Sequence, residues 1–268
     1  MNKKILGTLF VMSLVVIVTG CTTSQQETQE QQLQNVVSMN EGYVVDPSDN
    51  VHSRNLLENI EKSELSEEEK NGLILMREEE KLAHDVYTVL YEKWGQKTFN
   101  NIARSEQTHT DTVKVLLDKY EIADPVVSNE VGMFAAPEMQ KLYDDLVAKG
   151  SVSLVEALTV GAIVEDLDIS DLNKLLAETD NEDIQIAYQN LNKGSRNHLR
   201  AYVRQLERNG GEYTPQYISQ VEYDKIIAGE QERGSVDAKG QGQGQGSQNG
   251  QGRRGHGNGG GQGKSHIQ

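Results

Sequence analysis

The sequence predicts an all-α protein whose main part is a bundle of four long helices. Apolar residues recur at three- and four-residue steps over long stretches between about residues 66 and 208. Glycine, proline and capping residues separate these stretches at the points where helices would begin and end. No stretch alternates apolar and polar residues at period two for long enough to propose a strand.

The first long helix has the clearest boundaries. Ser66-Glu-Glu-Glu69 is a capping box, in which the serine and the last glutamate each satisfy a backbone N–H of the other's residue. Periodic apolar positions follow as far as Trp94, and Gly95 marks the end. This pattern predicts a helix that begins after Ser66 and ends at Trp94.

The remaining helices follow from the same periodicity and from their stop signals. Asp124-Pro125, Gly150 and Gly210-Gly211 end three of the periodic stretches. The expected helices, in chain order, span about Phe99–Tyr120, Pro137–Ala148 (short and amphipathic), Val152–Glu178, Glu182–Arg208 and, as a short terminal helix, Val221–Ile227.

Composition limits the chemistry that the protein can carry. The formal net charge is −15 and the pI is near 4.9. This argues against a nucleic-acid-binding protein, which needs a basic face to replace counterions. Cys21 is the single cysteine, so the chain cannot form an internal disulfide or a cysteine-based metal or redox motif. Carboxylates, histidines and hydroxyls must therefore supply the chemistry.

The N-terminus has the features of an export signal. Two lysines precede an apolar run from Ile5 to Val18, which is short for a membrane span of about 20 residues. The segment Val-Thr-Gly-Cys21 resembles a bacterial-type lipobox, with valine where leucine is usual. The resemblance implies that residues 1–20 are a signal peptide and that lipidated Cys21 tethers the protein to a membrane outside the cytoplasm. An uncleaved anchor with an incidental cysteine is the alternative.

Two polar segments flank the helical part. Residues 21–50 are rich in Gln, Glu, Ser, Thr and Asn, which predicts a flexible tether. Residues 234–268 are rich in glycine and glutamine, which predicts a disordered tail. His256 and His266 lie in this tail, where a solvated segment is favoured over loose metal binding.

Polar residues interrupt the inward apolar stripe of every long helix, well inside the helix. These residues are Glu80 on the first, Glu106 and His109 on the second, Glu165 and Asp168 on the third, and Ser195 and His198 on the fourth. Residues three apart share a helix face, so such a pair can point at one spot. Single glutamates combined with Glu-x-x-His pairs are the pattern of a dinuclear carboxylate site in a bundle. Oxygen and imidazole ligands suit iron or manganese, with zinc as an alternative.

Three segments carry a resemblance to a known family. They are Arg77-Glu-Glu-Glu-Lys-Leu-Ala-His-Asp-Val-Tyr87, Ser105-Glu-Gln-Thr-His109 and Gly194-Ser-Arg-Asn-His-Leu-Arg-Ala-Tyr202. They resemble the ferritin-like family of unknown function DUF2202 and, more distantly, rubrerythrin and bacterioferritin. The resemblance covers roughly Ser66 to Arg208. It implies a ferritin-like four-helix bundle with short extra helices as one domain over residues 51–230.

The characterised relatives suggest a first metal position. In them a glutamate ligand of the first helix precedes a tyrosine by seven residues, as Glu80 precedes Tyr87 here. A Glu-x-x-His motif follows on the second helix, as at Glu106 and His109. The resemblance therefore implies that Glu80, Glu106 and His109 hold one metal ion.

A second metal position is implied by the other two long helices. The third helix of rubrerythrin carries two acidic ligands three residues apart, as Glu165 and Asp168 are here. The fourth carries Glu-x-x-His, of which His198 is present while Ser195 replaces the glutamate. Glu165, Asp168 and His198 would then hold the second ion, more weakly and with a coordination position left open near Ser195.

Charge balance supports metal binding, with alternatives. Four acidic side chains in one core would need neutralisation, because an unpaired buried charge costs several kcal/mol. Two divalent cations would provide it. The metal-free alternative is neutralisation by shared protons or by arginines on the same helices. The candidate arginines are Arg77, Arg104, Arg196 and Arg200.

Two tyrosines and a further histidine of the long helices lie outside the predicted ligand set. Tyr87 and Tyr202 are expected to be core aromatics whose hydroxyls bind a carboxylate, or else redox-active neighbours of a metal. His84 lies off the inward stripe and is expected near the surface.

Two functions compete at this stage. The first is an oxidoreductase, in which a di-iron or di-manganese centre reacts with oxygen, peroxide or ferrous iron and a partner protein donates electrons. The second is a metal-free binding or scaffold bundle. Iron storage is a weaker third, because long tails and a lipid anchor suit a closed cage poorly. A fold by itself does not decide between them.

Overall fold

The computed structural model describes residues 56–242, and every regular element in this part of the chain is helical apart from one isolated bridge between Val236 and Gly242. The predicted signal peptide with Cys21, the predicted tether and residues 243–268 lie outside the described residues. The all-α prediction is confirmed. The helices are α3 (Glu67–Trp94), α4 (Lys97–Tyr120), α5 (Pro137–Gly150), α6 (Leu154–Glu178), α7 (Glu182–Arg208) and α8 (Gln220–Ala228), after a helical turn over residues 56–59.

The capping box at the start of α3 forms as the sequence predicts. The backbone N–H of Glu69 donates to Ser66 Oγ, and the backbone N–H of Ser66 donates to Glu69 Oε2. Gly95 ends the helix with a φ of 65°, in the left-handed region that glycine adopts without strain. α7 has the predicted bounds, whereas α4 begins at Lys97 rather than Phe99, and α6 at Leu154 rather than Val152.

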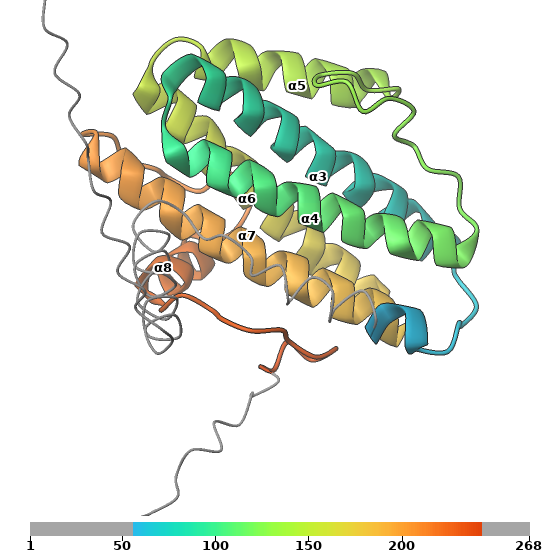
Figure 1. Ribbon diagram of the computed structural model, residues 1–268. Coiled ribbons are helices and arrows are strands. Elements are labelled where there is room, and N and C mark those ends of the chain that lie inside the picture. The colour runs from blue at the N-terminus through green and yellow to red at the C-terminus, as the bar shows by residue number, and fades with distance from the viewer. Residues whose placement is uncertain (1–55, 243–268) are drawn as a thin grey trace, which may run out of the picture.

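The four long helices form two helical hairpins that pack against each other (Figure 1). α3 packs most extensively on α4, and α6 on α7. α5 lies against α3 and α6, so α3 is covered on two sides. This arrangement explains why α3 buries almost every residue between Arg77 and Tyr87.

Two apolar cores lie along the bundle, with a polar layer between them. Leu73, Met76, Val113, Leu172 and Leu191 belong to one core. Val86, Ile102, Val164, Ile169 and Leu199 belong to the other. On each long helix the predicted polar positions fall between residues of the two cores, so the bundle places them at one level.

Residues 230–242 run along α7, although the composition assigned residues 234–242 to a disordered tail. The backbone of Val236 exchanges hydrogen bonds with the side chain of Asn190, and Lys193 Nζ donates to the carbonyl of Gly234. Glu232 forms ion pairs with Arg196 and Arg200. A glycine-rich composition does not reveal such contacts, because they depend on side chains of α7.

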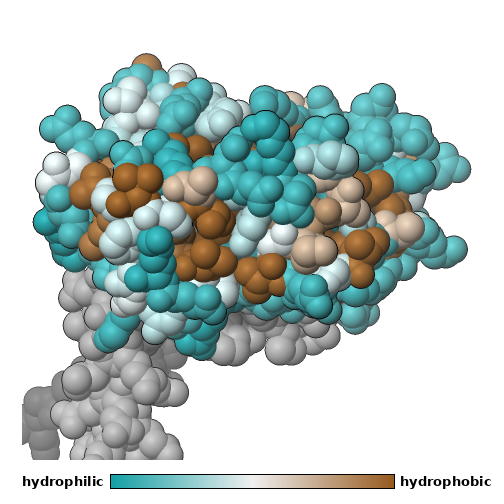
Figure 2. All heavy atoms as spheres, turned by 90° about the horizontal axis from the view of Figure 1, so that it is seen from above, coloured by the Kyte–Doolittle hydropathy of each residue, from teal (hydrophilic) through white to brown (hydrophobic). Residues whose placement is uncertain are grey.

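The outer surface is mixed in polarity. On the face seen from above, apolar patches are interrupted by hydrophilic residues (Figure 2). Within residues 56–242, no helix combines the length and the hydropathy that a membrane span requires.

Candidate metal centre

Five of the six predicted ligands meet in the polar layer between the two cores. They form two groups, in each of which three ligand atoms lie within 4.8 Å of one another: Glu80, Glu106 and His109 in the first, and Glu106, Glu165 and His198 in the second. All five residues are buried, with 5% or less of their surface exposed. The structure therefore brings together side chains from all four long helices.

Glu106 belongs to both groups, which the sequence did not predict. Its Oε2 lies 2.7 Å from Nδ1 of His109, and its Oε1 lies 2.7 Å from Nδ1 of His198. The two imidazole rings are stacked at an interplanar angle of 28°, with centroids 5.5 Å apart. The carboxylate of Glu106 thus lies between the two histidines, with one oxygen near each ring.

Asp168 stands outside both groups. Its carboxylate is hydrogen-bonded to Ser195 Oγ, which also lies 3.0 Å from the carbonyl oxygen of Leu191. In the second group Glu106 takes the place that the sequence assigned to Asp168. The assignment of Asp168 as a metal ligand stays a prediction.

The other ligands are held by neighbours on the same core. Tyr87 Oη donates to Glu165 Oε1 at 2.6 Å, so its hydroxyl has the predicted carboxylate partner. The ring of Tyr202 packs against that of Tyr87 with centroids 5.1 Å apart. Nε2 of His198 lies 3.1 Å from Ser105 Oγ. A hydrogen bond from Nε2–H to this hydroxyl leaves Nδ1 as the free ligand atom, facing Glu106 and Glu165.

Several polar atoms of the centre have no hydrogen-bond partner among the described residues. They include Oε1 of Glu80, Oε1 of Glu106 and Nδ1 of His198. The last two are 2.7 Å apart, yet their orientation does not make a hydrogen bond. Leaving buried polar atoms unsatisfied is costly, and each orphaned atom here can donate a lone pair to a cation. The donor set therefore fits two divalent metal ions.

The arginines do not neutralise this centre. Arg77 forms an ion pair with Asp124 and donates to Thr110. Arg196 and Arg200 pair with Glu232, and Arg104 is exposed. His84, partly buried, lies beside Asp85 with Nδ1 and Oδ1 2.8 Å apart. Metal ions or protons are left to balance the buried carboxylates.

Without metal, the centre must hold protons. Burial raises the pKa of Glu80 to about 8 and that of Glu165 to about 7. Burial would lower the pKa of His198, but Glu106 and Glu165 outweigh it and raise that pKa to about 10. Burial would raise the pKa of Glu106, but His198 and His109 lower it below its usual range.

These shifts predict how the stability of chelator-treated protein depends on pH. Glu80 and His198 both bind protons more tightly in the folded than in the unfolded state, so their contribution to stability is lost as pH rises. We expect the free energy of unfolding to fall by about 2 kcal/mol or more between about pH 6 and pH 9. Protein refilled with metal should lack this slope, since its ligands carry no protons to lose. Urea titrations at several pH values measure both curves, and a flat curve for the metal-free protein would contradict the prediction.

Two contributing residues were missed by sequence reasoning. Ser105 orients His198. The sequence signal for this role was the position of Ser105 next to Glu106 on a predicted helix. Glu79 lines the same pocket as Glu80, Glu106 and Glu165. Its position next to Glu80 takes it off the inward stripe, so periodicity alone excluded it.

Comparisons with known proteins agree with this description. The chain is 58% identical over 178 residues to the uncharacterised protein MJ0754 of Methanocaldococcus jannaschii, a match that covers 66% of this chain and 96% of that protein. The crystal structure of that hypothetical protein, from Methanococcus jannaschii DSM 2661, superposes with a TM-score of 0.64 at 58% identity, covering 65% of this chain and 99% of the solved one. Residues 69–230 match the model of an uncharacterised protein domain, DUF2202. The chain therefore belongs to the DUF2202 family, as its three characteristic segments had indicated.

Proposed function

We propose that this protein binds two divalent transition-metal ions, iron or manganese, and uses them for redox chemistry with oxygen or peroxide. The observation that carries the proposal is the pair of buried ligand groups that share Glu106, with orphaned lone pairs on Glu80, Glu106 and His198. A bound pair of such ions supplies electrons and polarises oxygen atoms. Since the single cysteine of the chain precludes a cysteine-based electron-transfer module, a partner protein would have to deliver electrons.

The chain's own residues position and protect this chemistry. Glu106 holds the two positions close together because one carboxylate serves both groups. Tyr87 fixes one oxygen of Glu165 and leaves the other directed at His198. The apolar cores on either side of the polar layer limit the access of water. This strengthens the electrostatic interactions among the ligands of the centre.

A metal-free scaffold is the second candidate, and one observation favours it. His109 contacts both Glu80 and Glu106, and His198 contacts Glu106 and Glu165. If both histidines were protonated, these two imidazolium groups could balance most of the buried negative charge. Such a bundle would be structural, and its surface would recruit a partner.

Metal content separates the two candidates. Protein purified without chelators should contain about two ions of iron or manganese per chain, in line with this ligand layout in other bundles. Adding either metal to stripped protein should raise its melting temperature, because metal binds the native state. If careful preparations contain no metal, and added iron, manganese or zinc leaves the melting temperature unchanged, the bundle is structural.

Ser195 provides a test of the open coordination position. The Ser195→Glu variant should tighten the weaker site by roughly ten- to a hundredfold, because it adds a carboxylate next to the second ligand group. The same variant should react more slowly with peroxide, since the added ligand fills the open position. Without metal it should be less stable than the wild type, because the new carboxylate faces Asp168, which Ser195 now binds. Calorimetric metal titration measures the affinities; two equal sites in the wild type, or no tightening in the variant, would refute the open position.

The location of the protein is part of the proposal. We propose that it is anchored to a membrane outside the cytoplasm through a lipid on Cys21, on the basis of the lipobox-like segment. The intact mass of protein extracted from membranes should correspond to a chain that starts at Cys21 and carries a diacylglyceryl group. A mass that matches an unmodified chain starting at Met1 would rule the anchor out.

A further inference from the structure

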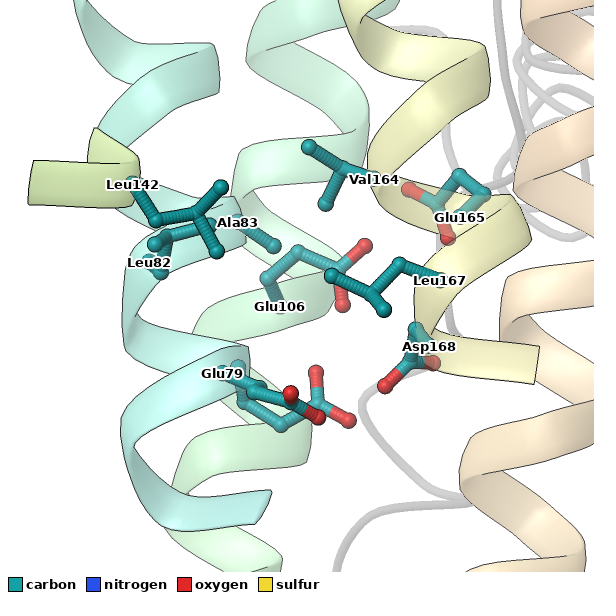
Figure 3. Close-up of a pocket in the computed structure, with 10 residues that line it drawn as sticks. Glu79, Leu82, Ala83, Glu106, Leu142, Val164, Glu165, Leu167 and Asp168 are labelled. Atoms are coloured by element: carbon teal, nitrogen blue, oxygen red, sulfur yellow. The ribbon is translucent and has the colours of Figure 1, made fainter. Parts of the chain in front are cut away.

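A narrow pocket leads from the surface of the bundle to the buried ligands. It lies between α3 and α6, with α5 at its edge, and its lining residues are Glu79, Glu80, Leu82, Ala83, Glu106, Leu142, Val164, Glu165, Leu167 and Asp168 (Figure 3). Glu79, Leu142, Leu167 and Asp168 are partly exposed, whereas Glu80, Glu106 and Glu165 are buried. The pocket therefore runs from partly exposed residues to carboxylates of both ligand groups.

Carboxylates line one wall of this pocket from its mouth to the centre. Figure 3 shows Glu79 of α3 and Asp168 of α6 with their carboxylates directed toward each other, beside Glu106. Asp171, one turn further along α6, lies close enough to Glu79 for the two carboxylates to interact. Asp171 is paired with Lys174 at 2.6 Å, and the side chain of Lys174 is 66% exposed. Because the lysine of this pair is largely exposed, the pair contributes little, and an arriving cation can displace Lys174 at low cost.

Two orphaned oxygens point to a cation rather than to a merely acidic wall. Oε1 of Glu80 and Oε2 of Glu79 are buried and have no hydrogen-bond partner among the described residues, and both side chains line the pocket. Glu80 is only 2% exposed. A buried carboxylate oxygen without a donor is costly, and in a pocket of carboxylates a cation is the group that satisfies it.

The remaining walls set the character of the route. Leu82, Leu142 and Leu167 provide apolar surface beside the carboxylates, so the pocket offers no positively charged group to an anion. Oxygen ligands without imidazole suit hard divalent cations such as Mn²⁺. Within residues 56–242, three ligand atoms come within 4.8 Å of one another only in the two groups of the centre. The outer carboxylates are thus arranged to pass a cation on, not to keep it.

We infer that Glu79, Asp168 and Asp171 form the uptake route by which divalent metal ions reach the buried centre. This inference rests on the proposed function, because it presupposes that the centre binds metal. Charge of one sign in a narrow cleft raises the rate at which counter-ions arrive, so Glu79 acts on the rate of loading and not on final occupancy.

Metal loading of the whole protein tests this inference, with Co²⁺ as the probe. Stripped protein is mixed with Co²⁺ in a stopped-flow instrument, and visible absorption reports the ion leaving water for carboxylate and imidazole ligands. The Glu79→Gln variant should take up Co²⁺ at a rate about tenfold or more below that of the wild type. Its cobalt content after prolonged incubation, measured by elemental analysis, should equal that of the wild type. The Glu92→Gln variant, which changes an exposed glutamate on the same helix, should load at the wild-type rate.

The outcomes distinguish this inference from the proposed function. If the wild type loads Co²⁺ and Glu79→Gln loads equally fast, the route is wrong and the centre stands. If Glu79→Gln loads at the normal rate to a lower final content, Glu79 supports binding instead, and the route is again wrong. If the wild type takes up no Co²⁺, both proposals fail together. Asp171→Asn, expected to slow loading as well, provides the same measurement should Glu79→Gln not fold.

Discussion

Replacing Glu106 by alanine is expected to remove both metal ions from the protein. Its two carboxylate oxygens lie 2.7 Å from Nδ1 of His109 and 2.7 Å from Nδ1 of His198, so one substitution takes a ligand from each group. Metal content should fall from about two ions per chain to near zero, because Glu106 belongs to both ligand groups. The rise in melting temperature on adding metal should disappear as well, a loss of about 2.7 kcal/mol of stabilisation for each ion where metal is at a hundred times its dissociation constant.

A matched control uses another buried glutamate of the bundle. Glu69 is 6% exposed and accepts hydrogen bonds from Thr179 and Asn181, far along α3 from the centre. Glu69→Ala should lower stability by about 1–3 kcal/mol, because it leaves buried donors unpaired, yet keep both ions. Elemental analysis of the two variants gives the answer. One ion retained in Glu106→Ala would show that the groups bind independently.

Replacing Gly194 by alanine is expected to displace His109. A Cβ atom built on Gly194 would lie 2.5 Å from Cε1 and 2.7 Å from Nε2 of the His109 ring, which is closer than such atoms approach in proteins. The ring or the α7 backbone has to move, and His109 cannot move without leaving Glu80 and Glu106. We expect the variant to lose the ion of the first group and about 1–3 kcal/mol of stability from overpacking.

Gly72→Ala is the control for overpacking alone. An alanine Cβ at this position would lie 2.6 Å from Cδ2 of Leu175. This atom is the flexible end of a side chain that packs against the core containing Leu73 and Met76, away from the ligands. This variant should keep its full metal content, whatever it does to the melting temperature. Metal analysis and thermal unfolding compare the pair, and unchanged metal binding in Gly194→Ala would show that α7 can shift without disturbing His109.

Much of the fold could be read from the sequence, because its signals are local. The capping box at Ser66, the stop at Gly95 and the apolar period of α7 depend on neighbouring residues in the chain. The start of α6 differs from the expected one because Ser153 Oγ accepts from the backbone N–H of Glu156 and so caps the helix there.

The composition of the centre was predictable, whereas its connectivity was not. Spacing places Glu106 and His109 on one helix face, and the structure brings them together with Glu80. Whether Glu106 or Asp168 completes the second group depends on side-chain rotamers and on Ser195, which binds Asp168. The sequence did not reveal Glu79 because an inward stripe assumes one buried face per helix, while α5 covers a second face of α3.

The division of the ligands between two helical hairpins has a consequence for affinity. Glu80, Glu106 and His109 belong to the hairpin of α3 and α4, and Glu165 and His198 to that of α6 and α7. The apolar cores on either side hold these hairpins in register, so folding itself gathers the ligands before any ion arrives. Preorganisation of this kind spares the binding step the entropy of ordering five side chains. Substitutions in the cores that let one hairpin rotate against the other would therefore weaken metal binding without touching a ligand.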